Sequence, residues 1–118
     1  MKRILIIDDS EVIRETLALI LGREFIVSKR ALGSQQFRFV AANEDIDLLI
    51  LGVAPQFGSE PVNLVRIAAE FPFAVLFLVD SKSTARAIEE HERVSCLTKP
   101  FNPYELHASV GRLLARSL

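Results

Sequence analysis

Residues able to do chemistry stand at the ends of apolar, strand-length runs of this chain. The acids Asp8 and Asp9 follow the first run, and Lys99 follows the last one, directly before Pro100. Carboxylates at such places either bind a divalent cation or cap the next helix. The ammonium of a lysine pairs with carboxylates or with a bound anion. The middle run ends at Gly52, which brings no reactive side chain.

Apolar runs alternate regularly with segments of helical period, which predicts the elements that position these residues. Most of the runs are almost continuously apolar, as is typical of strands covered on both faces. The predicted strands are 3–7, 25–31, 46–51, 73–79 and 94–98. The predicted helices are 10–23, 34–43, 61–71, 83–92 and 102–114.

This alternation predicts a single α/β domain over residues 1–118. A parallel sheet with right-handed crossovers and helices on both faces satisfies it. We expect a flavodoxin-like (βα)5 three-layer sandwich with strand order 2-1-3-4-5. That order brings the carboxyl ends of strands one and three to one crevice, where Asp8, Asp9 and Gly52 lie.

The chain resembles the receiver domains of response regulators over nearly its whole length. The acid pair, the frame from Asp47 to Leu51 and the Lys99-Pro100-Phe101 triplet carry the resemblance. It implies that Asp8 and Asp9 hold Mg²⁺ and that Lys99 binds a phosphoryl oxygen. It also implies a cis peptide between Lys99 and Pro100. The family's phosphorylated aspartate falls on Gly52, and no acid lies within four residues of that glycine on either side.

Further positions also lack the residues that the family uses for phosphorylation and switching. The Ser or Thr that swings toward the phosphoryl group falls on Val79, and the small residue after it falls on Asp80. The aromatic switch residue falls on Cys96. We therefore expect a degenerate, pseudo-receiver member that lacks the phosphoacceptor, with a weak or vacant Mg²⁺ site and no other cofactor.

Asp80 leaves several interpretations open. It can pair with Lys99 or add a third acid beside Asp8 and Asp9. It can also cap the following helix together with Ser81 and Ser83. An alternative function makes it a displaced phosphoacceptor. Strand alternation opposes that alternative, because it points Asp80 differently from the residue at position 52.

The leading hypothesis is a phosphorylation-independent protein-interaction module of bacterial signal transduction. The resemblance implies docking or homodimerisation through the surface formed by residues 83–92, 94–98 and 102–114. An enzyme or flavin carrier is disfavoured, because residues 8–11 are acidic where a phosphate cradle requires glycine and exposed amides.

Composition excludes several other classes. A net charge of −1 gives no electrostatic basis for binding nucleic acid or an anionic membrane. A single cysteine excludes an internal disulfide and a cysteine-based zinc cluster. No apolar run approaches the roughly 18 residues of a membrane span, and the N-terminus lacks a signal-peptide pattern. We expect a cytoplasmic protein.

Overall fold

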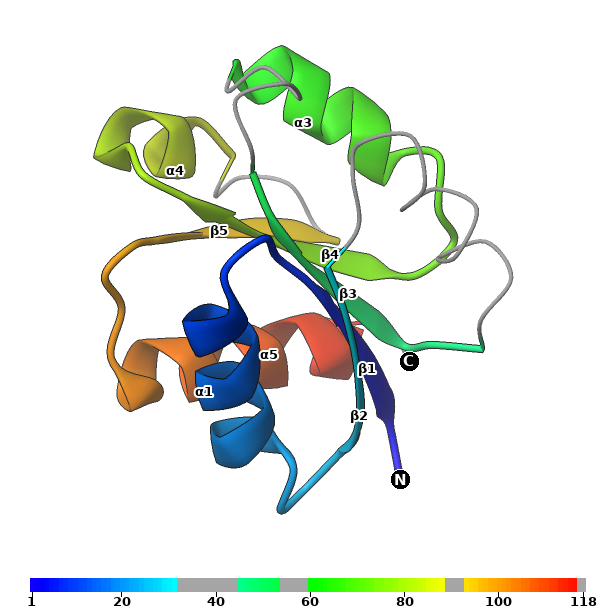
Figure 1. Cartoon of the computed structure of the whole chain (residues 1–118). Helices are drawn as coiled ribbons and strands as arrows, with labels where there is room; N and C mark the ends of the chain where they lie inside the picture. Colours follow the sequence, from blue (N-terminus) through cyan, green and yellow to red (C-terminus); the bar gives the residue numbers. More distant parts are fainter. Residues whose placement is uncertain (32–44, 54–59, 89–92, 117–118) are drawn as a thin grey trace.

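The computed structural model describes residues 1–31, 45–53, 60–88 and 93–116. The described strands form one parallel sheet of order β2-β1-β3-β4-β5, which confirms the predicted α/β fold (Figure 1). The strands are β1 (Arg3–Ile7), β2 (Ile26–Arg30), β3 (Leu48–Gly52), β4 (Ala74–Val79) and β5 (Val94–Thr98). The helices are α1 (Glu11–Leu21), α3 (Pro61–Ala68), α4 (Lys82–Ile88) and α5 (Pro103–Arg116). The helix predicted over 34–43 lies outside the described residues.

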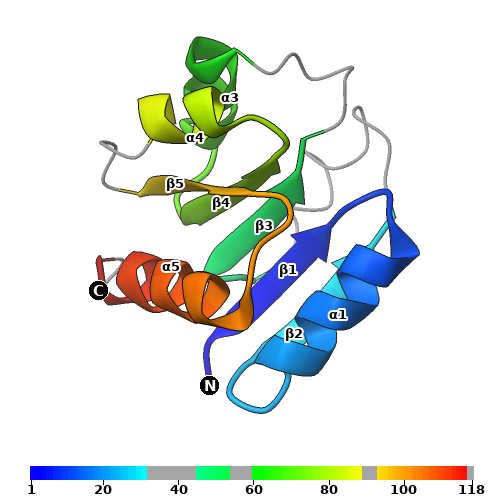
Figure 2. The ribbon, with the colours of Figure 1, turned by 90° about the vertical axis from the view of Figure 1, so that its left-hand side faces the viewer.

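The helices cover the sheet on both faces. Figures 1 and 2 show α3 and α4 on one face and α1 and α5 on the other. Because side chains alternate along a strand, the sheet divides its apolar residues between two cores. One core includes Leu49 and Phe77 beneath α3 and α4, and the other includes Ile50 and Leu76 beneath α1 and α5.

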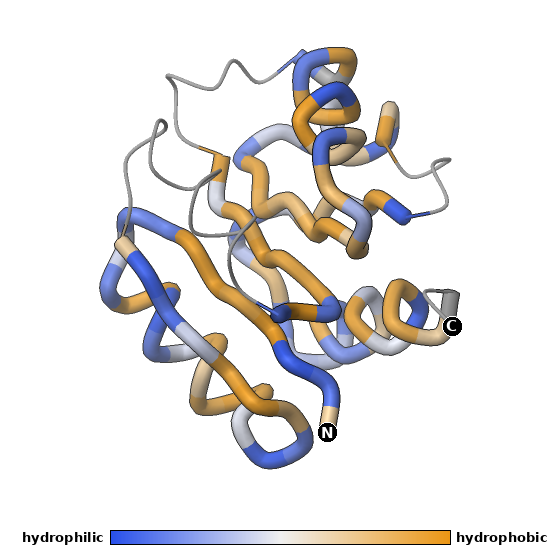
Figure 3. The backbone as a smooth tube through the Cα atoms, turned by 90° about the vertical axis from the view of Figure 1, so that its right-hand side faces the viewer, coloured by the Kyte–Doolittle hydropathy of each residue, from blue (hydrophilic) through white to orange (hydrophobic). Residues whose placement is uncertain are grey.

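The inner strands are buried on both faces, as their apolar sequences predict. All six residues of β4 are buried, whereas the edge strand β2 is largely exposed or half-buried. Figure 3 also shows that the inner strands are hydrophobic, whereas the helices mix hydrophobic and hydrophilic residues. The sheet therefore forms the buried centre of the fold, and Asp8, Gly52 and Lys99 lie at its carboxyl edge.

Helix α1 follows directly from the first acid pair. The hydroxyl of Ser10 accepts a hydrogen bond from the backbone N–H of Ile13 at 3.3 Å, so Ser10 caps the helix. Leu17 and Leu21 are fully buried, and Gly22 stands at the C-terminal cap. This geometry fixes the path of the chain as it leaves β1.

The buried face of α4 differs from the predicted one. The mostly polar sequence of this helix favours Ala87 and Ile88 as its inward residues. In the structure Ala87 is exposed, and Thr84, Ala85 and Ile88 are buried. Residues three and four positions apart lie on the same face of a helix, so Thr84 and Ala85 share the buried face with Ile88. Ala87 falls outside that face.

Candidate functional site

The carboxyl ends of β1 and β3 lie side by side. The two strands pair in parallel with Ile7 opposite Leu51, so the next residue of each, Asp8 and Gly52, meet at the same edge of the sheet. Gly52 is itself the last residue of β3, where it pairs with Leu78 of β4. The sequence predicted the strand to end one residue earlier.

Asp8 is buried, with 4% of its surface exposed. Its Oδ1 accepts a hydrogen bond from the backbone N–H of Ser10 at 2.8 Å. Its Oδ2 accepts one from Nζ of Lys99 at 3.1 Å. The guanidinium of Arg14 donates to the backbone carbonyl of Asp8 at 2.6 Å. Both carboxylate oxygens are thus satisfied within the protein, as a buried charge requires.

Because Gly52 has no side chain, the carboxylate of Asp8 has room beside it. A Cβ built on Gly52 would overlap Oδ2 of Asp8 and would lie 2.6 Å from Cγ and 3.2 Å from Cβ of the same residue. Any side chain at position 52 would therefore force Asp8 to turn. The carboxylate fills the volume into which such a side chain would extend.

Lys99 follows the edge strand β5 and connects that side of the sheet to this site. Its backbone N–H donates to the carbonyl of Val79 at 2.7 Å, and the Lys99–Pro100 peptide is cis, as expected. The ion pair spans 91 positions of sequence between the ends of β1 and β5. Its side chains are 26% exposed at Lys99 and 3% at Asp8, so water screens the pair only partly.

The other predicted acids do not join this pair. Asp9 and Asp80 are both exposed, and neither forms an ion pair within the described ranges. The hydroxyl of Ser81 accepts a hydrogen bond from the N–H of Thr84 at 3.5 Å and lies 2.8 Å from the hydroxyl of Ser83. Serine rather than Asp80 therefore supplies the side-chain cap at the start of α4.

The described residues at this edge supply few side chains of the kinds that bind metal ions. The described residues include no group of three or more His, Cys, Asp or Glu side chains able to hold a metal ion. Mg²⁺ prefers octahedral coordination by oxygen. Here Asp8 directs Oδ2 at an ammonium, and Gly52 offers no side-chain oxygen. These donors do not fit Mg²⁺ as they are arranged.

The two switch positions lie inside the protein. Val79 ends β4 with 3% of its surface exposed, and Cys96 lies in β5 with 7% exposed. Both pack in the core beneath α3 and α4. The valine side chain offers no hydrogen-bond donor, so β4 ends without a hydroxyl at this position.

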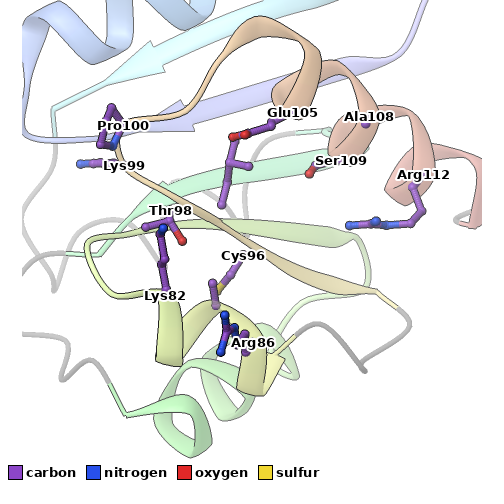
Figure 4. Close-up of a pocket in the computed structure, with 12 residues that line it drawn as sticks. Lys82, Arg86, Cys96, Thr98, Lys99, Pro100, Glu105, Ala108, Ser109 and Arg112 are labelled. Atoms are coloured by element: carbon purple, nitrogen blue, oxygen red, sulfur yellow. The ribbon is translucent and has the colours of Figure 1, made fainter.

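A groove that the sequence did not predict crosses β5 between α4 and α5. Its volume is about 630 Å³, and Figure 4 shows residues of all three elements around it. Lys82 and Arg86 come from α4, and Arg112 from α5. The resemblance pointed to this surface, but a hollow depends on the spacing of three elements. The feature of the sequence that could have indicated a hollow here is the small side chain of Cys96.

No family model and no curated protein matches the chain. Among solved structures, it is similar to a signal receiver domain of an HD domain-containing protein from Pseudomonas fluorescens Pf-5. The TM-score is 0.74 at 21% identity, over 98% of this chain and 88% of that one. It is similar to a two-component response regulator from Clostridium difficile, with TM-score 0.76 and 18% identity over 98% of both chains.

A third likeness is to the signal receiver domain of a signal transduction histidine kinase from Syntrophus aciditrophicus. That TM-score is 0.72 at 25% identity, over 98% of this chain and 91% of that one. The first and third of these structures are signal receiver domains, and the second is a two-component response regulator. The likeness confirms that this chain has the receiver fold.

Proposed function

We propose that this protein is a pseudo-receiver: a receiver-fold module that binds other proteins in bacterial signal transduction without being phosphorylated. One observation carries the proposal. The carboxylate of Asp8 fills the space beside Gly52 and is paired with Lys99. The position of the family's nucleophile is therefore both unreactive and occupied.

Phosphoryl transfer needs a nucleophile, a cation to neutralise the developing charge, and a group that holds the transferred oxygens. Glycine supplies no nucleophile. Lys99 would have to leave Asp8 before it could bind a phosphoryl oxygen. Mg²⁺ would have to displace that same lysine from the buried carboxylate of Asp8, so the proposal includes no resident metal and no catalytic activity.

Loss of the switch residues favours a surface with one conformation. Val79 and Cys96 are both buried and lack the hydroxyl and the ring whose movements the resemblance implies. A ligand shifts a conformational equilibrium only through a difference in affinity for two states. We infer constitutive binding through the α4-β5-α5 surface, and we place the protein in the cytoplasm, where two-component partners act. In the described ranges, no helix has the length and hydropathy of a membrane crossing.

The test is incubation of the purified protein with acetyl phosphate and Mg²⁺, followed by intact-mass measurement. We expect no phosphoryl adduct. The exposed acid Asp80 is the candidate for a displaced acceptor, so the variant Asp80→Asn is measured in parallel. A hydroxylamine-labile adduct on the wild-type protein that is absent from Asp80→Asn would establish the alternative function. A labile adduct on both proteins would overturn the proposal through another acid.

A further inference from the structure

The groove between α4 and α5 has a charge opposite to that of the whole chain. Its described lining contains the cations Lys82, Arg86, Lys99 and Arg112, with Glu105 as the single acid. The whole chain has a net charge of −1. Lys99 is paired with Asp8, so the remaining positive charge of the described lining is that of Lys82, Arg86 and Arg112. A concave wall with an excess of one sign attracts the opposite sign.

The cations on the α4 wall are the most available to a ligand. Lys82 and Arg86 are exposed, and neither forms an ion pair within the described part of the chain. On the opposite wall, one nitrogen of Arg112 donates to the hydroxyl of Ser95 at 2.9 Å. That bond holds the guanidinium against β5 and leaves its other N–H groups for a ligand. Figure 4 shows Arg86 and Arg112 coming from the two sides of the groove.

The acid of the lining is partly engaged at its own helix. The amide of Asn102 donates to Oε1 of Glu105 at 3.3 Å, and the backbone N–H of Glu105 donates to the Asn102 side chain at 2.9 Å. This reciprocal pair is a helix cap at the start of α5. Glu105 keeps its negative charge in this cap, so it offsets one of the cations of the described lining and leaves the others in excess.

Between the charged walls the lining includes small apolar side chains, with Thr98 and Ser109 as polar neighbours. Ala85, Cys96 and Ala108 contribute to it from α4, β5 and α5. Small residues leave the groove its volume of about 630 Å³. An apolar side chain from a ligand would bury its surface there, while carboxylates on either side of it would meet the cations.

We propose that this groove binds an acidic segment of a partner protein, with an apolar side chain of the segment seated over Cys96. The inference rests on the proposed function and specifies its ligand. A second copy of the chain fits less well. In a two-fold dimer the same patch faces itself, so the cations of one groove would oppose those of the other.

The experiment is selection from a random peptide library displayed on phage, with immobilised full-length protein as the bait. The variant Lys82→Glu/Arg86→Glu is the comparison. Its matched control is Arg23→Glu/Arg66→Glu, which makes the same change in net charge at exposed positions outside the groove. We expect enriched peptides with net negative charge and an apolar anchor. Their affinity should fall roughly tenfold or more in the groove variant and stay unchanged in the control.

A second variant tests the apolar anchor. Cys96→Phe fills the groove, so it should abolish binding of the enriched peptides while the exposed charges remain. If the phenylalanine prevents folding, the two surface variants still decide the question. No enrichment, enrichment of neutral or basic peptides, or equal affinity for the groove variant would each overturn the inference.

The phosphorylation assay is run on the same preparations to separate the two proposals. If the selection fails and no phosphoryl adduct forms, the proposal of an acidic ligand is contradicted, whereas the proposed pseudo-receiver function is not. A phosphoryl adduct removes that function, whatever the selection returns. Self-association that Lys82→Glu/Arg86→Glu abolishes would identify a second copy as the occupant and contradict the inference.

Discussion

The carboxylate of Asp8 lies in the space that a side chain on Gly52 would need, and Nζ of Lys99 holds it there at 3.1 Å. The relationship joins β1, β3 and β5 at the carboxyl edge of the sheet. It forms an internal ion pair at the edge where the resemblance to receiver domains implies a cation and a phosphoryl group.

Replacing Gly52 by alanine should destabilise the protein, because the new Cβ would overlap Asp8. The carboxylate would have to rotate out of its contacts with Lys99 and Ser10 while remaining in a buried place. We expect a loss of about 1–3 kcal/mol in the free energy of unfolding, measured by urea denaturation.

Gly111→Ala is the matched control for this substitution. Gly111 lies inside α5, and a Cβ there would meet nothing within 4 Å. Alanine in a helix interior should therefore stabilise the protein by about 0.5–1 kcal/mol. A Gly52→Ala protein as stable as wild type would show that Asp8 does not depend on the missing side chain.

The ion pair itself should contribute measurably to stability. Lys99→Met leaves the Asp8 carboxylate buried without its cation, and we expect a cost of about 2–3 kcal/mol, below the full range for buried pairs because Lys99 is 26% exposed. Asp8→Asn keeps an acceptor for the Ser10 N–H. A double-mutant cycle over the two sites should give a coupling energy of about 1–2 kcal/mol.

The exposed pair between Lys29 and Glu15 provides the reference for that cycle. Its atoms are closer, at 2.8 Å, but the side chains are 37% and 60% exposed. The cycle with Lys29→Met and Glu15→Gln should give a coupling of less than about 1 kcal/mol. Equal coupling energies for the two pairs would contradict the importance of burial at Asp8.

Binding of the selected acidic peptides should weaken with ionic strength. The screening length falls from about 10 Å at 0.1 M salt to about 3 Å at 1 M. Fluorescence anisotropy should show an affinity that declines over this range for the wild-type protein. The decline should be much smaller for Lys82→Glu/Arg86→Glu. An affinity that does not change with salt would mean that apolar contacts alone hold the ligand.

Most of the fold could be predicted from the sequence because strand-length and helix-period patterns alternate regularly. That alternation leaves few topologies, and the order β2-β1-β3-β4-β5 is the expected one. Errors arose where a local pattern was weak. The short, mostly polar α4 gave no clear face, and Ala87 was placed inward although it is exposed.

The sequence indicated that Asp8, Gly52 and Lys99 meet at one edge of the sheet, but not how they are arranged. It also grouped with them Asp9 and Asp80, which are exposed and outside the ion pair. The sequence indicated that Gly52 supplies no nucleophile. It could not indicate that Asp8 turns into the space beside Gly52, because that rotamer depends on Lys99, 91 positions away. The groove was missed for a similar reason: its volume depends on the side chains that α4, β5 and α5 each contribute.

The most direct test of the closed site is a ¹⁵N NMR titration with Mg²⁺, alone and with beryllofluoride. The Ser10 amide is the reporter, because its N–H donates to Asp8 Oδ1 at 2.8 Å. With Asp8 held by Lys99, millimolar Mg²⁺ should leave the Ser10 and Lys99 amide resonances in place, with or without beryllofluoride. A saturable shift centred on these two amides would show an open acidic pocket and contradict the account.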